Sequence, residues 1–493
     1  MKPSHRTFFG WIGIILVAIA LIALLFTAGR ALVLLFQQSI SAISFPYQLN
    51  YGEGPLLDQT VRLTHGISLY RLDVPPYTIE NYPPVFMLAQ APWVSAFGPS
   101  YYYGRITSLI SILVSALFLG LTAHTITRSR VAALVSAVLL PAFPYVFHWS
   151  ALARIDSLAL AFSLVGLWIA VRWPKSTWAA FWAALMLGLA VYTRQTYLLA
   201  APLAAFTYRW AVGGATPAFK FAVMLGGLVV GLFAVLLVAT EGGFWFHLVT
   251  ANVNALDGSL ISIYADEVAR ALTVLLVMAL IYLLGGWINA RSRRAWWLVA
   301  PYLLGGLAVA LTIAKIGSDV NYLYELCAAL CLTAGAFIAW CGRLSAVRAA
   351  AIVIIAVQVA AMQDISEQKY APIISERIDR RPEMDSLLQL VNDETRTIIA
   401  DEAMGLLPLV GKPILFQPFE MSQLAAAGLW DETDFLTQLA QGSYPVVLIY
   451  NPYRNPNLRF ERWTPAMLSV INSSHRLATQ RAETSVYWYN DPR

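Results

Sequence analysis

The sequence predicts a polytopic α-helical membrane protein with a small α/β domain at its C-terminal end. Of its 493 residues, 58% are hydrophobic and only 12% are charged, about half of the roughly 25% that is usual in soluble domains. Apolar stretches of the length needed to cross a bilayer, about 20 residues, recur along the chain. This composition excludes a disordered chain, a disulfide-stabilised scaffold and an ordinary cytosolic enzyme.

The distribution of charge divides the chain into two parts. Residues 365–493 contain 16 acidic and 12 basic residues, a density typical of soluble proteins, whereas residues 1–364 contain 12 acidic and 21 basic ones. We therefore predict a membrane domain over 1–364 and a soluble domain over 365–493, with the boundary near Asp364.

The membrane domain contains about eleven predicted transmembrane helices. The first run, Phe8 to Gly29, follows a basic N-terminus as in a signal peptide, but it is long and lacks a small-x-small cleavage site, which favours a helix. The predicted spans are 10–30, 104–127, 131–148, 157–172, 177–193, 197–212, 218–240, 268–289, 296–314, 321–341 and 349–364.

Basic residues between these spans predict the orientation. Thirteen of them fall on one side with no acid among them, and the positive-inside rule makes that side cytoplasmic. The N-terminus is then cytoplasmic, the soluble domain is extracytoplasmic, and all 12 acids of the membrane domain lie at or near the outer face, where we expect the chemistry. The thirteen are Lys2, Arg6, Arg128, Arg130, Arg172, Lys175, Arg209, Lys220, Arg291, Arg293, Arg294, Arg343 and Arg348.

The first outer segment, 31–103, is the longest and is predicted to be structured. Residues 56–64 are amphipathic, Tyr82-Pro83-Pro84 is a stop, and the aromatic-rich residues 85–97 are expected at the membrane interface. In the soluble domain, strand-like and helix-like runs alternate, which is typical of a small α/β fold. The strand-like runs are 397–400, 413–416, 446–450 and 485–489, and the helical ones are 420–427, 432–441 and 465–472.

Nucleotide-binding motifs are absent from the sequence. The run from Gly405 to Gly411-Lys412-Pro413 is one residue too long for a P-loop and ends in Pro, and neither G-x-G-x-x-G nor H-E-x-x-H occurs. We therefore expect no direct use of ATP or a nucleotide sugar, and no nucleic-acid partner. The three cysteines, Cys327, Cys331 and Cys341, lie in one apolar run and are interpreted as packing residues.

Two outer acids are candidates for chemistry. Glu53 lies between Gly52 and Gly54, which add no bulk and would let a carboxylate approach a substrate closely; alternatively it is a solvated acid in a glycine turn. Asp156 lies where a predicted span begins, so it either belongs to a site or caps that helix through the free first-turn N–H groups.

Three outer cations are candidates for an anion site. Arg154, Arg194 and Lys315 lie on the leaflet where no excess of basic residues is expected, and they suit an anionic ligand such as a phosphate. Alternatively, Arg194 or Lys315 pairs with Glu325 or Asp319. The external histidines, His148 and His247, are interpreted as packing residues or, alternatively, as metal ligands beside Glu53 or Asp156.

This constellation resembles the GT-C class of polyprenyl-phosphate-dependent glycosyltransferases. It is close to the protein mannosyltransferase and aminoarabinose transferase group and to bacterial relatives of the RgtA/B/C/D type. The resemblance covers most of residues 10–340 and departs in supplying one Glu where the family commonly has Asp, often with a second acid beside it. It rests on Glu53, Asp156, Asn81-Tyr82-Pro83-Pro84, Phe97-Gly98-Pro99-Ser100, Gly104-Arg105 and the run Lys315…Asn321-Tyr322…Glu325.

The resemblance implies an inverting sugar transfer at the outer face of a bacterial plasma membrane. The donor would be a polyprenyl-phosphate sugar, the acceptor a glycan, lipid or protein, and membrane lipids the surroundings. Glu53 would be the base, Asp156 its supporting partner, and Arg154, Arg194 and Lys315 the phosphate cradle. A divalent metal, if one is used, would lie on Glu53, Asp156 and His148. The implied supporting residues are Tyr82, Arg105, Asn321, Tyr322 and Glu325.

Two other functions fit the same residues. One is a transporter or flippase of an anionic lipid-linked substrate that uses the outer cations and Glu325 as a proton-coupled site. The other is an inactive scaffold whose outer domain binds envelope polymers. The acids lie at the outer rim and not at the bilayer midplane, which favours the enzyme.

Overall fold

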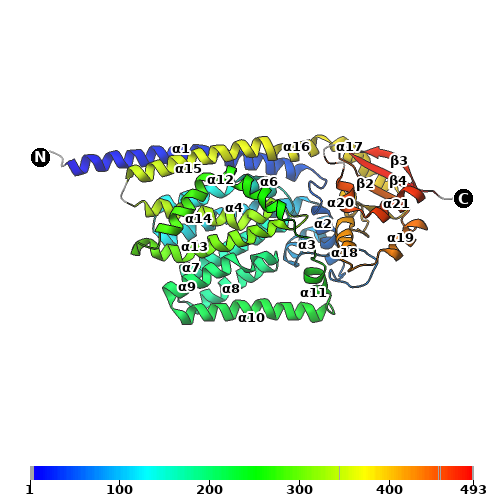
Figure 1. Ribbon diagram of the computed structural model, residues 1–493, viewed down its shortest axis with the longest axis horizontal. Helices are drawn as coiled ribbons and strands as arrows, with labels where there is room; N and C mark the ends of the chain where they lie inside the picture. Colours follow the sequence, from blue (N-terminus) through cyan, green and yellow to red (C-terminus); the bar gives the residue numbers. More distant parts are fainter. Residues whose placement is uncertain (1–4, 343–344, 453–454, 456, 491–493) are drawn as a thin grey trace.

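The computed structural model describes residues 5–342, 345–452, 455 and 457–490. The molecule is elongated, with a helical bundle at one end and a small domain containing the sheet at the other (Figure 1). The two chain termini lie at opposite ends of the long axis. The fold class predicted from composition, a helical membrane protein with a C-terminal α/β domain, is confirmed.

Eight helical segments within the described residues have the length and hydropathy to cross a membrane. These properties support eight of the eleven predicted spans. The long helices at these segments are α1 (His5–Ser44), α4 (Tyr102–Thr127), α7 (Ile155–Arg172), α10 (Ala215–Ala239), α12 (Gly258–Gly285), α13 (Ala290–Ala310), α14 (Tyr324–Trp340) and α15 (Ser345–Ile365).

Shorter helices occupy the other three predicted positions. They are α5 (Arg130–Leu139), α8 (Thr177–Val191) and α9 (Ala200–Gly213). The predicted span 131–148 is interrupted: α5 is followed by η1 (Leu140–Ala142) and then α6 (Pro144–Trp149). Pro141 and Pro144 explain the interruption, because proline cannot donate the backbone hydrogen bond that continues a helix. The count of eleven is therefore not confirmed.

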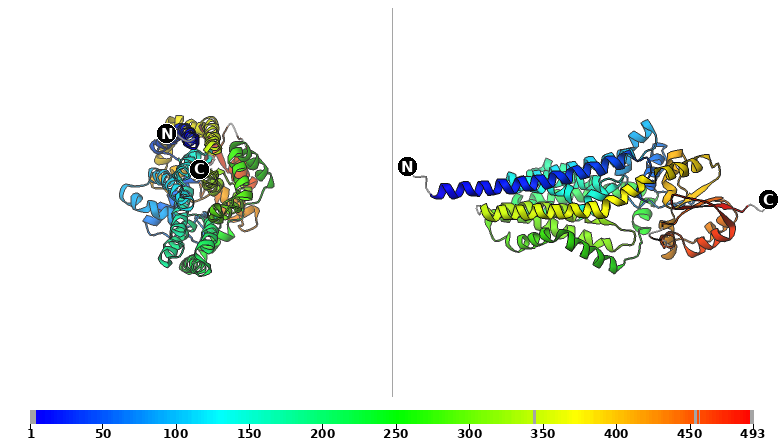
Figure 2. Two further views of the ribbon diagram at one scale, coloured as in Figure 1. Left: turned by 90° about the vertical axis from the view of Figure 1, so that its left-hand side faces the viewer. Right: turned by 90° about the horizontal axis from the view of Figure 1, so that it is seen from above.

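Helices α1 and α15 run side by side along the edge of the bundle (Figures 1 and 2). α1 exposes large apolar side chains, including Trp11, Ile22 and Phe26, as expected of a helix that faces lipid. It extends to Ser44, well beyond the predicted end at residue 30, and Phe45-Pro46 terminates it. α15 continues through η6 (Ser366–Tyr370) into α16 (Ala371–Asp379), so helix spans the region of Asp364 without a break.

The first outer segment is structured, as predicted. α2 (Glu53–Thr64) buries its first eight residues, and α3 (Val85–Phe97) packs against it. α3 exposes Leu88, Trp93 and Phe97, which is the pattern of a helix that lies in a membrane interface. The chain then returns through α4 to the bundle. Further outer turns contain η2 (Gln195–Leu198), α11 (Gly243–Trp245), η3 (Phe246–Thr250), η4 (Leu311–Ala314) and η5 (Val320–Leu323).

The C-terminal domain is built on a four-stranded sheet in the order β1-β2-β4-β3. β1 (Ile398–Ala400) is parallel to β2 (Val446–Tyr450), and β4 (Thr484–Tyr489) pairs antiparallel with both β2 and β3 (His475–Arg481). The predicted strand 413–416 is wrong: only Phe416 pairs, through one bridge to Tyr77. The other elements are α17 (Arg381–Asp393), η7 (Glu402–Leu406), η8 (Pro408–Val410), α18 (Pro418–Ala426), α19 (Thr433–Ala440), α20 (Leu458–Arg462) and α21 (Pro465–Ser474).

The C-terminal domain sits directly on the first outer segment. Gly54 of α2 faces Gly405 of η7 so closely that a Cβ on Gly54 would lie 2.8 Å from the Gly405 Cα. The Tyr101 hydroxyl donates to the Gly405 carbonyl (2.7 Å), and the Asp58 carboxylate accepts from the backbone N–H of Ile414 (3.0 Å). This seam fixes the domain over one end of the bundle.

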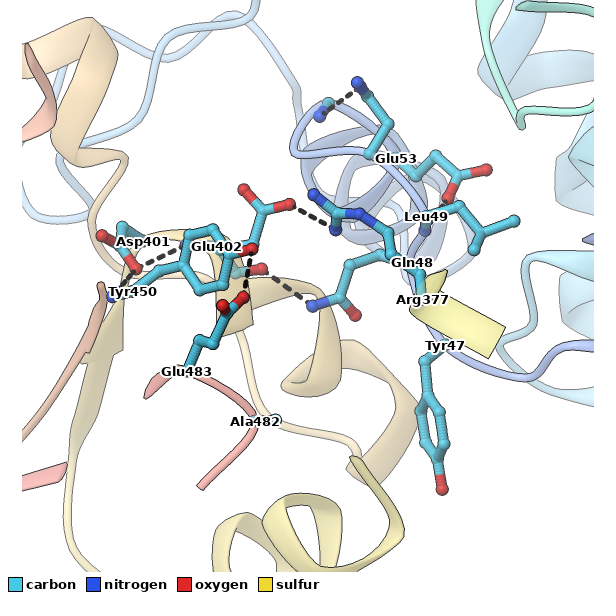
Figure 3. A network of polar contacts seen from close by, with 12 residues as sticks. Tyr47, Gln48, Leu49, Glu53, Arg377, Asp401, Glu402, Tyr450, Ala482 and Glu483 are labelled. Carbon is cyan, nitrogen blue, oxygen red and sulfur yellow. Dashed lines mark hydrogen bonds and ion pairs between the residues drawn. The ribbon is translucent and has the colours of Figure 1, made fainter. Parts of the chain in front are cut away.

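A polar network continues this seam into the domain (Figure 3). Arg377 of α16 pairs with the Glu402 carboxylate at 2.7 Å, and the Gln48 amide donates to the Glu402 backbone carbonyl at 2.8 Å. The next residue, Leu49, donates its backbone N–H to the Glu53 carboxylate. The segment leading into α2 is thus held between the C-terminal domain and the membrane domain.

Candidate functional site

A cavity of about 660 Å³ lies where one end of the bundle meets residues 50–82 and the C-terminal domain. It contains both polar and apolar walls. The residues that line it and enter the argument below are Asn50–Gly52, Asn81, Tyr82, Trp149, Arg154, Arg194–Thr196, Asn252, Asn254, Leu256, Ile261, Leu311, Thr312, Ala314–Asp319, Tyr322, Phe419 and Glu420.

Arg154 presents a buried cation to this cavity. Its side chain donates from Nη2 to the Tyr82 hydroxyl (3.1 Å), and its guanidinium lies over the rings of Tyr82 and Trp149 at 5.6 and 5.5 Å. Within the described residues it forms no ion pair, and its Nε has no hydrogen-bond partner. A desolvated guanidinium without a carboxylate partner is well suited to bind an anion.

Gly52 makes room for this guanidinium. A Cβ on Gly52 would lie 1.4 Å from Arg154 Nη1, so any side chain there would displace the cation. Gly54 makes room for the backbone of Gly405 instead. The two glycines beside Glu53 therefore serve the packing of Arg154 and of the C-terminal domain, which differs from the role in substrate approach that the sequence suggested.

Lys315 presents a second cation to the cavity. Its ammonium donates to the backbone carbonyl of Asn252 at 2.9 Å and also to the Asn252 side chain, and within the described residues it pairs with no acid. Burial lowers the pKa of Lys315 below its ordinary value. The alternative pairing of Lys315 with Glu325 or Asp319 does not occur. All three cations of the predicted cradle line this one cavity, and two of them lack a carboxylate partner.

Arg194, the third cation, is paired. Its Nη1 donates to Asp156, whose carboxylate also accepts from Asn321 Nδ2 (3.1 Å) and Trp149 Nε1 (2.6 Å). The guanidinium lies 4.3 Å from the ring centre of Tyr322. The partner of Arg194 is thus Asp156 and neither Glu325 nor Asp319. Asp156 does not cap α7; its carboxylate is committed to these three side chains and does not line the cavity.

Glu53 lies behind the cavity wall and does not line it. Its carboxylate accepts four hydrogen bonds: from Leu49 N–H and Ala153 N–H, both at 2.6 Å, and from Arg105 Nε and Nη2 at 3.0 and 2.8 Å. Burial opposes its ionisation, but the Arg105 guanidinium and the two N–H donors outweigh burial and lower the pKa of Glu53. A carboxylate bonded in this way holds the turn before Arg154 and has no lone pair directed at the cavity.

The predicted supporting residues divide between the cavity and its surroundings. Tyr82 and Tyr322 line the cavity, and Asn321 orients Asp156 behind it. Arg105 belongs to the Glu53 cluster, where its remaining donors bind the backbone carbonyls of residues 42, 45 and 47. Glu325 is buried in the first turn of α14 and does not line the cavity, and within the described residues neither of its carboxylate oxygens has a hydrogen-bond partner.

The residues predicted to hold a metal do not fit one. Glu53 and Asp156 are each bonded to an arginine, and His148 stacks on Tyr370 with ring centres 5.0 Å apart. In the part of the chain that the structure describes, no group of three or more His, Cys, Asp or Glu side chains is placed to coordinate an ion. We therefore derive no step of the chemistry through a metal.

Sequence reasoning missed the contribution of the C-terminal domain to the cavity wall. Glu420 and its neighbour Phe419 come from the C-terminal domain, and the Glu420 carboxylate accepts from the Tyr51 hydroxyl at 2.8 Å. Their local sequence carries no motif, and only the folded contact between the two domains brings them to the site. Asp319, which the sequence suggested as a partner of Arg194 or Lys315, also lies in the wall.

Comparison with known proteins identifies the fold. No protein-family profile matches the sequence, and neither does any curated protein sequence. Among solved structures, ArnT from Cupriavidus metallidurans in the apo state superposes with a TM-score of 0.62 at 12% identity, covering 98% of both chains. The chain has the fold of ArnT. The same protein bound to undecaprenyl phosphate gives a TM-score of 0.61, with 97% of this chain and 98% of that chain covered.

Two larger proteins share the fold more distantly. The oligosaccharyltransferase AglB from Archaeoglobus fulgidus, in complex with an inhibitory peptide and a dolichol-phosphate, has a TM-score of 0.52 at 11% identity, covering 94% of this chain and 74% of AglB. The arabinofuranosyltransferase AftD from Mycobacteria has a TM-score of 0.54 at 14% identity, covering 95% of this chain and 40% of AftD. The fold expected from the GT-C resemblance is confirmed, and with its apolar helices it makes this chain an integral membrane protein.

Proposed function

We propose that this protein is a membrane glycosyltransferase that moves a sugar from a polyprenyl-phosphate donor to an acceptor at the extracytoplasmic face. The observation that carries the proposal is the pair of cations, Arg154 and Lys315, that line one cavity and, in the part of the chain that the structure describes, have no carboxylate partner. Two partly desolvated cations on one wall favour an anion such as a phosphate strongly.

The other wall of the cavity suits the lipid part of such a donor. Leu256, Ile261, Leu311, Ala314 and Ile316 form an apolar surface beside Lys315, close to the ends of membrane helices. A polyprenyl chain could leave the cavity along this surface into the bilayer while its phosphate stays between the cations. The structure of ArnT bound to undecaprenyl phosphate, a protein of the same fold, supports this choice of donor.

The chemistry follows from where charge develops. When the bond between the anomeric carbon and the phosphate oxygen breaks, negative charge grows on the phosphate, and fixed cations in a recessed site stabilise it without reorganising. Arg154 and Lys315 fill this role. The Asp156–Arg194 pair shapes the adjacent wall, and Glu53 holds the turn that carries Arg154.

The orientation is part of the same proposal. The one-sided distribution of basic residues in the connectors supports an N-terminus inside a bacterial plasma membrane, with the cavity and the C-terminal domain outside. Nucleotide sugars are not available there, so a lipid-linked donor is required.

Binding of the donor phosphate tests the proposal directly. Affinity for undecaprenyl phosphate is measured on the purified protein in lipid nanodiscs, and transfer is measured with a panel of radiolabelled polyprenyl-phosphate pentoses and hexoses. Arg154→Ala and Lys315→Ala should each weaken binding by about tenfold or more, equivalent to about 1.4 kcal/mol. Lys220→Ala, an exposed cation at the opposite end of the bundle, is the matched control.

The outcomes separate clearly. Unchanged affinity in both cavity variants, or an equal loss in Lys220→Ala, would contradict the phosphate site. Failure of the wild-type protein to consume every donor in the panel would contradict the transferase itself. Because Glu53 and Asp156 are occupied by arginines, we expect the same transfer with and without EDTA.

A further inference from the structure

The cavity wall includes a carboxylate from the C-terminal domain. Glu420 lies in the first turn of α18, and its Oε2 accepts from the hydroxyl of Tyr51, in the segment that leads into α2. Phe419 packs edge-on against the Tyr51 ring, with centroids 6.4 Å apart. The C-terminal domain therefore completes the site and contributes both an acid and an aromatic surface to it.

Glu420 differs from the other acids around the cavity. Glu53 and Asp156 lie behind the wall and are paired with arginines. Asp319 lines the wall, but its Oδ1 caps η5 by accepting from the Val320 N–H at 2.7 Å. Glu420 forms no ion pair within the described residues, and the single side-chain donor bound to it is a neutral phenol.

The surroundings of Glu420 suit a proton acceptor. Burial in the recessed wall raises the pKa of Glu420 above its ordinary value, while Arg462 and Arg154 keep the ionised form accessible. The Tyr51 hydroxyl, which donates a hydrogen bond to Glu420, favours the ionised form as well. A carboxylate with a raised pKa is a stronger general base than an exposed one.

We propose that Glu420 contacts the acceptor and takes the proton from its attacking hydroxyl. This inference rests on the proposed function above. The acceptor oxygen forms a bond to the anomeric carbon, and the bond from that carbon to the phosphate oxygen breaks. The electron pair leaves with the polyprenyl phosphate between Arg154 and Lys315, and the hydroxyl proton passes to the Glu420 carboxylate. The acceptor class is a hydroxyl compound whose apolar face lies against Phe419 and Tyr51, as a carbohydrate would.

The test compares Glu420→Gln with two acids that should matter less. Using the donor that the wild-type protein consumes, kcat for transfer, including slow transfer to water, should fall by about 10²-fold or more. Affinity for undecaprenyl phosphate should stay within about twofold of wild type. Glu383→Gln, an exposed glutamate in the first turn of α17, is the matched control in the same domain, and Asp319→Asn tests the other acid of the wall.

The pH profile keeps the inference falsifiable if Glu420→Gln does not fold. The acid limb of wild-type kcat should lie above the ordinary glutamate value of about 4.3, and Glu420→Asp should retain a limb but at a shifted pH. A normal kcat in folded Glu420→Gln, an unshifted limb in Glu420→Asp, or a loss confined to Asp319→Asn would overturn the inference while leaving the transferase intact. If the wild-type protein transfers no sugar, both proposals fall together.

Discussion

Two glutamates near Tyr51 and Gly52 differ in how fully their carboxylates are hydrogen-bonded. Glu53 follows Gly52 and faces into the protein, where four hydrogen bonds fill its carboxylate. Glu420 reaches the neighbouring Tyr51 from the other domain and faces the cavity with one side-chain hydrogen bond. The cations show the same contrast: both terminal nitrogens of Arg105 donate to protein groups, whereas Arg154 has no acid partner among the described residues.

The contrast separates structural from functional charge. In a low-dielectric interior, a charge must be compensated by partners, and a fully compensated charge supports the fold. A charge that lines a cavity with its partners missing is available to a ligand. Around this site the number of partners, more than the residue type or its place in the topology, indicates which role a side chain has.

Removing the partner of Glu53 should produce the largest effect. Arg105→Ala leaves the Glu53 carboxylate buried without its cation and three backbone carbonyls without a donor, which should cost about 3–5 kcal/mol of stability. Thermal unfolding of the detergent-solubilised protein measures this loss. Arg30→Ala, which removes an exposed pair with Glu367, should change the stability by less than about 1 kcal/mol. Similar melting temperatures of the two variants would show that the buried Arg105–Glu53 pair stabilises the fold no more than an exposed pair does.

Much of this fold was predictable from the sequence because lipid imposes a strong pattern. Long apolar runs and one-sided basic residues predicted the bundle, and the outer positions of Arg154, Arg194 and Lys315 predicted that they would meet. The short segments were harder, since Pro141 and Pro144 break what hydropathy reads as a span. The strand His475–Arg481 was missed because most of its residues are polar and exposed.

The partners of each charge could not be predicted. Neighbours in space such as Glu53 and Arg105, or Asp156 and Arg194, are far apart in the chain, so sequence alone could not distinguish a paired acid from a free one. The contribution of Glu420 depends on how the C-terminal domain docks, and nothing in its local sequence encodes that contact.

Fully paired charges also occur in the C-terminal domain, and a second substitution tests whether they stabilise it. Glu402 pairs with Arg377 and Arg462, each at 2.7 Å. Glu402→Gln should destabilise the domain by about 1.5–3 kcal/mol, the range for charged hydrogen bonds. Burial raises the pKa of Glu402, but Arg377 and Arg462 outweigh it and lower the pKa to about 2.

The sign of the pH dependence follows from that lowered pKa. The stability from Glu402 is present above the unfolded value, about 4.3, and is lost as the pH falls towards 2. Unfolding of the C-terminal domain, followed by tryptophan fluorescence between pH 7 and 3, should therefore depend less on pH in Glu402→Gln. A variant as pH-dependent as the wild type would show that these ion pairs do not hold the domain.

Gly52→Ala should displace the Arg154 guanidinium from the cavity. The new Cβ would lie 1.4 Å from Arg154 Nη1, so the guanidinium must move away from the position it holds in the cavity. Affinity for undecaprenyl phosphate should fall about tenfold, close to the effect of Arg154→Ala, and the double variant should lose little more. Gly258→Ala, where the added carbon meets open space, is the control. Additive losses in the double variant would show that Gly52 acts independently of Arg154.

Lys315→Arg should give the smallest effect, a change in how the affinity for undecaprenyl phosphate depends on pH. Burial lowers the pKa of Lys315, so the ammonium that holds the phosphate loses its proton at a lower pH than an exposed lysine would, below about 10.4. Affinity of the wild-type protein for undecaprenyl phosphate should therefore weaken by a few-fold between pH 7 and 9.5. Arginine keeps its charge over this range, so the variant should bind with nearly constant affinity, whereas Lys220→Arg should retain the wild-type decline. A decline that persists in Lys315→Arg would assign the titration to another group, and Arg154 would then stand as the principal phosphate contact.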